Sequence, residues 1–321
     1  QMLRPLFAGI SFCLLLLFSR CSPDVEPPTL PMNWQAVDSI NQHLPAGIRL
    51  YQGRNDSLPI NAWYVYIEEP DPDIRTRVVM SRDSTDNRES ISDFARNLGA
   101  CVVINGGYFT MNLVPARHAG LLKMEDRVHY PATRRVTRKD TAYATARGTL
   151  GFLEGDRPDI SWAISRGDSL FRLEPPYDHR PGKPDLSRDS THWVSWPVRE
   201  AISAGPVLVS EGKLNITDNG EVFFGSSIPN THPRSAVGIT PSGALLLMVV
   251  DGRQADSRGV DLRELATLML EIGAFEALNL DGGGSSALVV NQTLINRPVG
   301  GTFQREVMSA LAVFCRPAPN P

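Results

Sequence analysis

The sequence Asn279-Leu280-Asp281-Gly282-Gly283-Gly284-Ser285-Ser286 is flanked by short apolar runs on both sides. This pattern predicts a buried strand, a carboxylate at its end, a glycine turn and a second strand. Three successive glycines favour positive φ angles or the close approach of another group. Successive backbone N–H groups in such a turn can form an anion-binding nest, and the two serine hydroxyls add donors. The stretch therefore predicts hydrolytic chemistry on a charged substrate.

Two other apolar runs end in a similar polar cluster. Val102-Val103-Ile104 ends at Asn105-Gly106-Gly107, and the run 247–250 ends at Asp251-Gly252-Arg253. Because active-site residues gather on loops at the ends of rigid strands, we expect these three ends to converge. The structural alternative is a set of separate hairpin turns, since Asn-Gly and Asp-Gly are common hairpin signals.

Three polar residues at these ends are the candidate catalytic groups. Asp281 is the leading candidate, and acid–base work near neutral pH requires burial or a like charge to raise its pKa. Asp251 is expected as a second carboxylate, so that the pair divides into acid and base; a turn aspartate bonded to its own backbone is the alternative. The Asn105 amide carries a donor and an acceptor that suit a hydroxyl or a phosphate oxygen.

Arginines near a glycine nest suit an anionic substrate, because guanidinium groups bind phosphate and carboxylate bidentately. Buried ion pairs with the aspartates are the alternative. An aromatic side chain beside a polar loop can stack on a sugar or pack in the core, and His232 can shuttle protons or be structural. The candidate binding residues are Arg234, Arg253, Gly282, Gly283, Gly284, Ser285, Ser286 and Tyr108. The paired carboxylates are also compatible with Ca²⁺ or Mg²⁺, and the sequence leaves metal binding open.

The N-terminal segment resembles a bacterial lipoprotein signal. Arg4 precedes an apolar run at 6–18, which is too short to span a bilayer comfortably and ends near Cys21. We expect a signal peptide over 1–21 with a lipidated Cys21, and a Pro-rich tether over 22–33. The protein is then an exported periplasmic or cell-surface lipoprotein of a bacterium. Arg20 departs from the usual small residue before the cysteine, so a plain secretory signal is the alternative.

The rest of the chain predicts one α+β domain over 60–317, preceded by a lead-in at 34–59 with a short helix. A mixed, largely antiparallel sheet with a few packed helices is expected, with strands at 63–67 and 77–80 as partners. Helices are expected at 89–98, stopped by Gly99, and after the cap at Asp261. The segment 130–200 is expected to form a variable insertion or the rim of a cleft.

Composition and cysteine content exclude some classes of function. The chain has 321 residues, 42% of them hydrophobic, and a formal net charge of −3, so neither a basic field nor a basic run supports nucleic-acid binding. No Cys–His spacing indicates zinc. An exported compartment permits a disulfide between Cys101 and Cys315, but two buried, unpaired thiols in adjacent strands are the favoured interpretation.

The motifs occur together in an order that resembles the phosphodiester glycosidase domain family. The match spans roughly 60–315 and rests on the segments 105–109, 203–209, 232–238, 250–253, 279–286 and 305–311. The resemblance implies a mixed α/β fold and hydrolysis of a sugar-1-phosphodiester on a phosphorylated glycan or exopolysaccharide. The products would be a free sugar and a phosphomonoester. A glycosidase for uncharged glycans and a non-catalytic glycan-binding lipoprotein are the alternatives.

Overall fold

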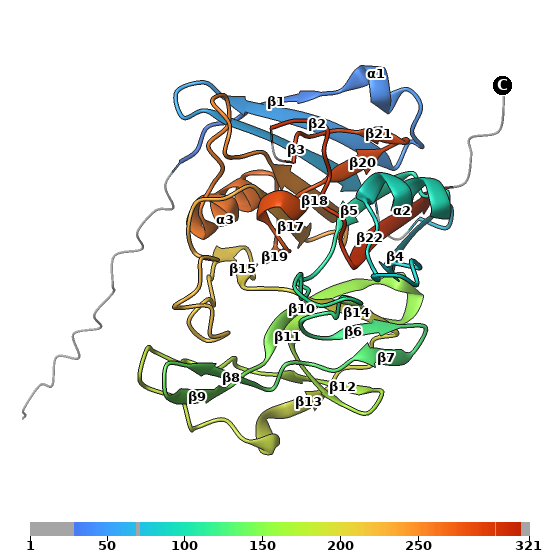
Figure 1. Ribbon diagram of the computed structural model, residues 1–321. Helices are drawn as coiled ribbons and strands as arrows, with labels where there is room; N and C mark the ends of the chain where they lie inside the picture. The colour runs from blue at the N-terminus through green and yellow to red at the C-terminus, as the bar shows by residue number, and fades with distance from the viewer. Residues whose placement is uncertain (1–28, 69–70, 299, 316–321) are drawn as a thin grey trace, which may run out of the picture.

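Strands from three sheets supply most of the buried side chains in this computed structural model, which describes residues 29–68, 71–298 and 300–315 (Figure 1). Every strand pairing among the described residues is antiparallel. The expected α+β class is confirmed, with several antiparallel sheets in place of one mixed sheet. The expected signal segment and Cys21 lie outside the described residues.

The largest sheet, called the central sheet below, has eight strands. In spatial order they are β1 (Asn33–Ala36), β2 (Ile48–Asn55), β3 (Ile60–Ile67), β18 (Leu245–Val250), β17 (Arg234–Ile239), β19 (Glu276–Asn279), β15 (Val207–Ser210) and β16 (Lys213–Leu214).

A five-stranded side sheet contains both the glycine-turn exit and the closing strand. Its order is β21 (Thr293–Leu294), β20 (Leu288–Val290), β5 (Val102–Asn105), β22 (Ser309–Cys315) and β4 (Ile74–Met80).

A seven-stranded insertion sheet lies between β5 and β15 in the sequence and forms the lower part of Figure 1. Its order is β13 (Trp193–Ser195), β12 (Ser169–Leu173), β11 (Pro158–Arg166), β10 (Arg147–Phe152), β14 (Glu200–Ser203), β6 (Leu122–Met124) and β7 (Arg127–Tyr130). A separate hairpin joins β8 (Arg135–Arg138) to β9 (Thr141–Ala144). The segment expected as a variable insertion therefore folds mainly as a regular sheet.

The helices are short and lie outside the sheets. They are α1 (Asp38–Asn41), α2 (Ile91–Leu98) and α3 (Leu262–Glu271), with 3-10 turns at Glu154–Asp156, Ser190–His192 and Gly283–Ser285. Two of them follow the sequence signals. Gly99 ends α2 in the left-handed conformation, and Asp261 and Glu264 form the expected capping box of α3. No helix in 29–68, 71–298 or 300–315 is long and apolar enough to cross a bilayer.

One hydrophobic core is shared by all three sheets, and β18 shows how the central sheet is covered on both faces. Leu245, Leu247 and Val249 join the shared core, whereas Leu246, Met248 and Val250 pack with α3. Because alternate side chains of a strand point to opposite faces, a strand buried on both faces reads as an unbroken apolar run. Helix α2 covers the outer face of the side sheet.

Two local expectations need correction. The short helix expected in the lead-in, at 34–44, is present as α1, but it is confined to Asp38–Asn41, and the residues before it form strand β1, in which Trp34 packs edge-on against the Tyr64 ring with 4.9 Å between ring centres. The strand expected at 77–80 exists as β4, but its partner is β22 of the side sheet, whereas β3 pairs with β2 and β18. Tertiary packing decides both outcomes, since local propensity does not choose a partner.

The segments expected as tether and lead-in are packed into the domain where the structure describes them. Leu30 is 4% exposed, and the Met32 backbone N–H donates to the Glu271 carboxylate at the end of α3. Strand β2 pairs with β3 along its whole length. Among the described residues, those from Leu30 onward are therefore part of the packed domain.

A disulfide joins Cys101 to Cys315, so the favoured interpretation as two unpaired thiols is wrong. Cys101 directly precedes β5, and Cys315 is the last residue of β22. The two strands are neighbours, with Val102 opposite Val313. The disulfide thus joins two residues that are 214 positions apart in the sequence. It fixes the end of β22, the last strand of the domain, to the start of β5.

Candidate active site

Ends of strands from two sheets meet at one place. Arg234, the first residue of β17, pairs with Val250 at the end of β18, and Ala236 pairs with Asn279 at the end of β19. Because antiparallel neighbours run in opposite directions, the start of one strand lies beside the ends of the others. The Asp281 N–H donates to Gly106 O over 3.0 Å, which connects this edge to the end of β5.

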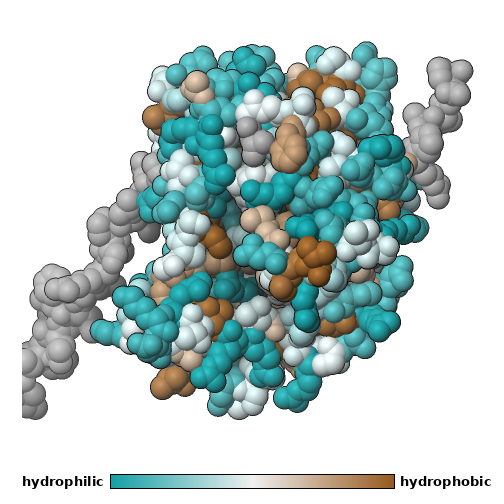
Figure 2. Space-filling model, viewed as in Figure 1, coloured by the Kyte–Doolittle hydropathy of each residue, from teal (hydrophilic) through white to brown (hydrophobic). Residues whose placement is uncertain are grey.

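A pocket of about 150 Å³ opens at these strand ends. It is lined by Tyr108, Ser227, Ile228, His232, Arg234, Arg253, Asp281, Gly282, Gly283, Gly284 and Arg305. Figure 2 shows the face of the molecule that is seen in Figure 1, with mostly hydrophilic residues on its surface. The pocket brings together most of the candidate residues, and it is strongly cationic.

Asp281 is the one carboxylate that lines this pocket. Burial raises the pKa of Asp281 to about 6, although hydrogen bonds from Ser285 and the Gly282 N–H and the charge of Arg305 act in the opposite direction. The Gly282 N–H donates to Asp281 Oδ1 over 2.9 Å. A carboxyl group that titrates near neutral pH can exchange a proton with substrate or water during turnover.

Three guanidinium groups face Asp281 around the pocket, from Arg234, Arg253 and Arg305. Arg234 is 2% exposed and is anchored by its donors to the backbone carbonyls of Val260, Ile228 and Asn230. Arg305 lies against the glycine turn, where a Cβ at position 284 would come within 2.6 Å of its Nη2. A glycine is therefore needed at 284 for the guanidinium to approach.

His232 positions the exposed Arg253. Its Nε2 bonds Ser227 O over 2.9 Å, and its Nδ1 lies 3.2 Å from Arg253 Nη2. The guanidinium can only donate, so Nδ1 is the acceptor and the ring is neutral. Burial and the charges of Arg234 and Arg253 lower the pKa of His232, which agrees with this tautomer. The arrangement favours a structural role over proton transfer.

The glycine turn does not form the expected open nest. The Gly283 N–H donates to Pro233 O, and the N–H groups of Ser285 and Ser286 donate back to Gly282 O and Gly283 O. The Gly282 N–H donates to Asp281, which leaves Gly284 as the only residue of 282–286 whose N–H has no acceptor among the described residues. The turn therefore shapes the pocket by lacking side chains, and the arginines supply most of the donors.

Asn105 does not line the pocket, and its contact with substrate stays a prediction. It is fully buried, its Nδ2 donates to Asp281 O over 2.7 Å, and its Oδ1 accepts from Ser235 Oγ and the Ala287 N–H. Since the amide is committed to protein groups on both sides, Asn105 fixes the backbone of Asp281.

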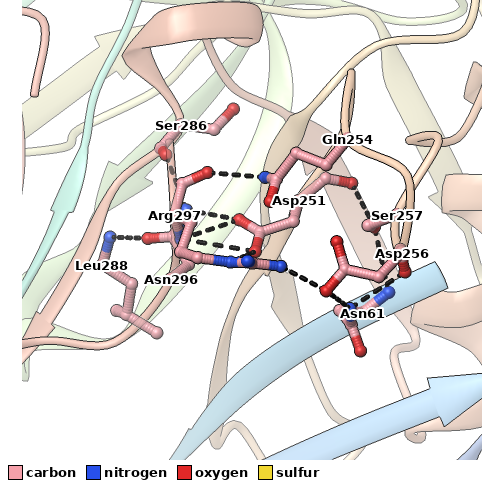
Figure 3. A network of polar contacts seen from close by, with 9 residues as sticks. All are labelled: Asn61, Asp251, Gln254, Asp256, Ser257, Ser286, Leu288, Asn296 and Arg297. Carbon is pink, nitrogen blue, oxygen red and sulfur yellow. Dashed lines mark hydrogen bonds and ion pairs between the residues drawn. The ribbon is translucent and has the colours of Figure 1, made fainter. Parts of the chain in front are cut away.

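Asp251 does not line the pocket, so the expected pair of carboxylates is not formed. It is fully buried, and Oδ1 accepts from Asn296 Nδ2 at 3.1 Å and the Arg297 N–H at 3.0 Å (Figure 3). Burial raises the pKa of Asp251 to about 6. Asn296 in turn donates to Ser286 O and accepts from the Leu288 N–H. Asp251 therefore ties the loop that carries Arg253 to the exit of the glycine turn.

Three further candidates have defined places. Tyr108 lines the pocket, and its hydroxyl donates to Gly205 O over 2.7 Å. Ser285 is buried beside Asp281 and accepts from Arg305 Nη1 over 3.4 Å. Ser286 is fully buried, and its hydroxyl has no partner among the described residues. Neither serine lines the pocket, and their contact with substrate stays a prediction.

Sequence analysis missed Arg305 and the loop residues Ser227 and Ile228 as members of the pocket. Arg305 has one usable signal, because it lies shortly before an apolar strand, as Arg234 does. The loop between β16 and β17, which contains Ser227 and Ile228, carries no such signal. Its position depends on hydrogen bonds from Arg234 to carbonyl groups of the loop.

The residues at the pocket do not fit a resident Ca²⁺ or Mg²⁺. A single carboxylate faces three guanidinium groups, whereas such cations need several oxygen ligands. Within 29–68, 71–298 and 300–315, no group of three or more His, Cys, Asp or Glu side chains is arranged to hold a metal ion.

Part of the sequence is similar to known proteins. A family model described as phosphodiester glycosidase matches residues 98–314. An uncharacterized prophage-derived protein of Bacillus subtilis, YomE, is 33% identical over 119 residues. Human N-acetylglucosamine-1-phosphodiester alpha-N-acetylglucosaminidase is 33% identical over 107 residues. Each match takes up 33% of this chain but only 18% and 20% of those two relatives.

Solved structures support the same fold over nearly the whole chain. The zebrafish N-acetylglucosamine-1-phosphodiester alpha-N-acetylglucosaminidase catalytic domain, auto-inhibited by its pro-peptide, aligns with a TM-score of 0.58 at 20% identity. The alignment covers 89% of this chain and 88% of that one. A hypothetical protein from Synechocystis aligns with a TM-score of 0.59 at 19% identity, over 84% of this chain and 62% of its own.

Proposed function

Because the chain belongs to the phosphodiester glycosidase family, we propose that it hydrolyses sugar-1-phosphodiesters at the bond between the anomeric carbon and the phosphate oxygen. The products are a free sugar and a phosphomonoester. The observation that carries the proposal is the pocket itself, where one carboxylate with a raised pKa faces three guanidinium groups. An uncharged glycan would leave those cations without a partner, so the charge of the pocket favours a phosphorylated substrate.

The arginines bind the diester and stabilise the departing phosphate. The buried Arg234 is held by three backbone carbonyls, so it is organised before the substrate arrives. Negative charge grows on the bridging oxygen as the bond to carbon breaks. Fixed cations placed where charge develops lower the barrier without reorganising during the reaction.

Asp281 acts as the general base in this proposal. The leaving group is a phosphomonoester, whose second pKa is about 6, so it needs little protonation to depart. The attacking water does need help, because it must lose a proton as its oxygen bonds to the anomeric carbon. Asp281 takes that proton, and the electron pair of the breaking C–O bond goes to the phosphate.

The pH dependence of turnover follows from this role. A base must be ionised, so kcat/KM is expected to rise about tenfold per pH unit below the pKa of Asp281, at about 6, and to level off above it. Initial rates on one cleavable diester from pH 4 to 8 measure this limb. An activity that falls through pH 6 would instead assign Asp281 as a general acid.

A panel of sugar-1-phosphodiesters and matched glycosides without phosphate tests the function. We expect mass spectrometry to show free sugar and phosphomonoester from the diesters alone. In water enriched in heavy oxygen, the label is expected in the sugar, because water attacks carbon. Label in the phosphate would contradict the proposed bond. Cleavage of the plain glycosides would favour an ordinary glycosidase, and saturable binding without product would favour a glycan-binding protein.

The place of action is a further part of the proposal. The apolar run before Cys21 supports export and lipid attachment in a bacterium. A phosphorylated glycan or exopolysaccharide outside the cytoplasm is then the natural substrate class. The disulfide between Cys101 and Cys315 is also typical of exported proteins.

A further inference from the structure

The guanidinium of Arg147 is half-buried and has no hydrogen-bond acceptor or salt-bridge partner among the described residues. It begins β10 of the insertion sheet and stacks on Phe223, with Cζ 3.8 Å from the ring centre. Burial lowers the pKa of Arg147, which shows that its charge is partly desolvated. The cation–π contact and the charge of the nearby Glu221 compensate part of that cost.

Neighbouring charged groups are already committed. Glu221 is fully buried and accepts from the Gly148 N–H, the Val207 N–H and the Thr217 hydroxyl. Arg138, which also lies near Arg147, donates to the carbonyls of Val222 and Phe224 on either side of Phe223. Arg138 thus holds the surface beneath Arg147 in place, whereas the donors of Arg147 remain available to a ligand.

Arg147 lies close to the pocket of Asp281. The rings of Phe223 and Tyr108 are 5.9 Å apart between their centres, and Tyr108 lines the pocket. The Tyr108 hydroxyl is also within reach of the charges of Asp281, Arg234 and Arg147 together. Arg147 does not itself line the pocket, but Phe223 and Tyr108 connect it to the pocket wall.

We propose that Arg147 binds a second oxyanion of the substrate, a carboxylate or a phosphate, carried beyond the phosphodiester that is cleaved. The inference rests on the proposed function and narrows the substrate class to diesters with an additional negative charge. The planar guanidinium presents paired N–H donors that match an oxyanion bidentately, and Phe223 fixes its plane.

The wild-type protein provides the first test. The methyl phosphodiester of glucuronic acid 1-phosphate is compared with that of glucose 1-phosphate, and a carboxylate-bearing aglycone on glucose 1-phosphate is compared with its neutral amide. In one of these pairs, kcat/KM is expected to be roughly 10–100-fold higher for the charged member, the range of a charge-assisted hydrogen bond. The pair that shows the preference says which side of the substrate carries the oxyanion. Equal values within both pairs would overturn the proposal.

The variant Arg147→Met tests whether this residue is the cause. We expect the preference for the charged member to disappear through a higher KM, with kcat on the neutral member retained. Arg147→Lys should keep part of the preference, because it retains the charge without the paired donors. Arg166→Met is the matched control, since Arg166 is also an arginine on an aromatic ring, 5.6 Å from the centre of Trp193, and it should change nothing.

A purely structural Arg147 would give a different result. In that case the variants would lower kcat/KM equally for charged and neutral members, which would overturn the proposal. If Arg147→Met does not fold, the lysine variant and the wild-type ratio decide. If the wild type cleaves none of the diesters, the proposed function fails, and calorimetric affinities for glucuronic acid 1-phosphate and glucose 1-phosphate still measure the second oxyanion site.

Discussion

Replacing Asp281 with asparagine is expected to lower kcat by about 10²–10⁴-fold, the contribution of a positioned general base. Asparagine has the same shape but cannot accept a proton at neutral pH. KM is expected to change little, because the arginines bind the phosphate. The pH limb near 6 should vanish with the carboxylate. Initial rates on a cleavable sugar-1-phosphodiester, with a thermal melt to verify folding, measure this effect.

The same substitution at Asp251 is the matched control. Both aspartates have raised pKa values of about 6, but only Asp281 lines the pocket. Asp251→Asn is expected to keep kcat within a few-fold of wild type while the melting temperature falls, since an amide NH2 replaces Oδ2, which accepts from the Arg297 N–H and forms an ion pair with its guanidinium. Should folded Asp251→Asn lose as much turnover as Asp281→Asn, the two carboxylates work as a pair and the single-base mechanism is wrong.

Removing the disulfide is expected to lower the free energy of unfolding by about 2–5 kcal/mol, because a long closed loop restricts the unfolded chain strongly. The loop here contains most of the domain, because Cys101 and Cys315 are 214 positions apart in the sequence. In a domain of this size, the loss corresponds to a decrease in melting temperature of roughly 5–15 °C. Thermal melts of the Cys101→Ser/Cys315→Ser double variant and the wild type measure it.

Reduction provides the control for this prediction. A thiol reductant should lower the melting temperature of the wild type to that of the double variant and leave the double variant unchanged. Turnover well below the transition should be the same in all samples, since neither cysteine lines the pocket. An unchanged melting temperature in the reduced wild type would contradict the stabilising role.

Local signals in the sequence predicted helices α2 and α3 at their observed places. Ser90 and Gly99 bound α2, and Asp261 and Glu264 cap α3. Each of these residues acts on a helix next to it in the sequence, so the helix ends can be predicted without knowing the fold. The partner of β4 was not visible. Its choice between β3 and β22 depends on contacts more than 200 residues away in the chain, which no local pattern encodes.

The sequence predicted which motifs come together at the candidate site, but it did not predict which of their side chains face the pocket. Strand ends with polar clusters do converge, as the positions of Arg234, Arg253 and Asp281 show. Sequence could not tell which polar groups face solvent. Asn105 and Asp251 follow strands just as Asp281 does, but their side chains turn into the protein and bind backbone groups there. The direction of a side chain at a strand end depends on the neighbouring loop.

The insertion sheet has a consequence for how this architecture can diversify. Its chain departs next to Gly106, whose carbonyl binds Asp281, and returns at Gly205, whose N–H binds Asn279 O. Backbone hydrogen bonds thus fix both ends of the insertion near Asp281. Residues 122–203 between these ends supply none of the pocket lining. The stretch between them can therefore vary among related proteins. Such variation would change which sugars are bound and leave the residues that cleave the bond unchanged.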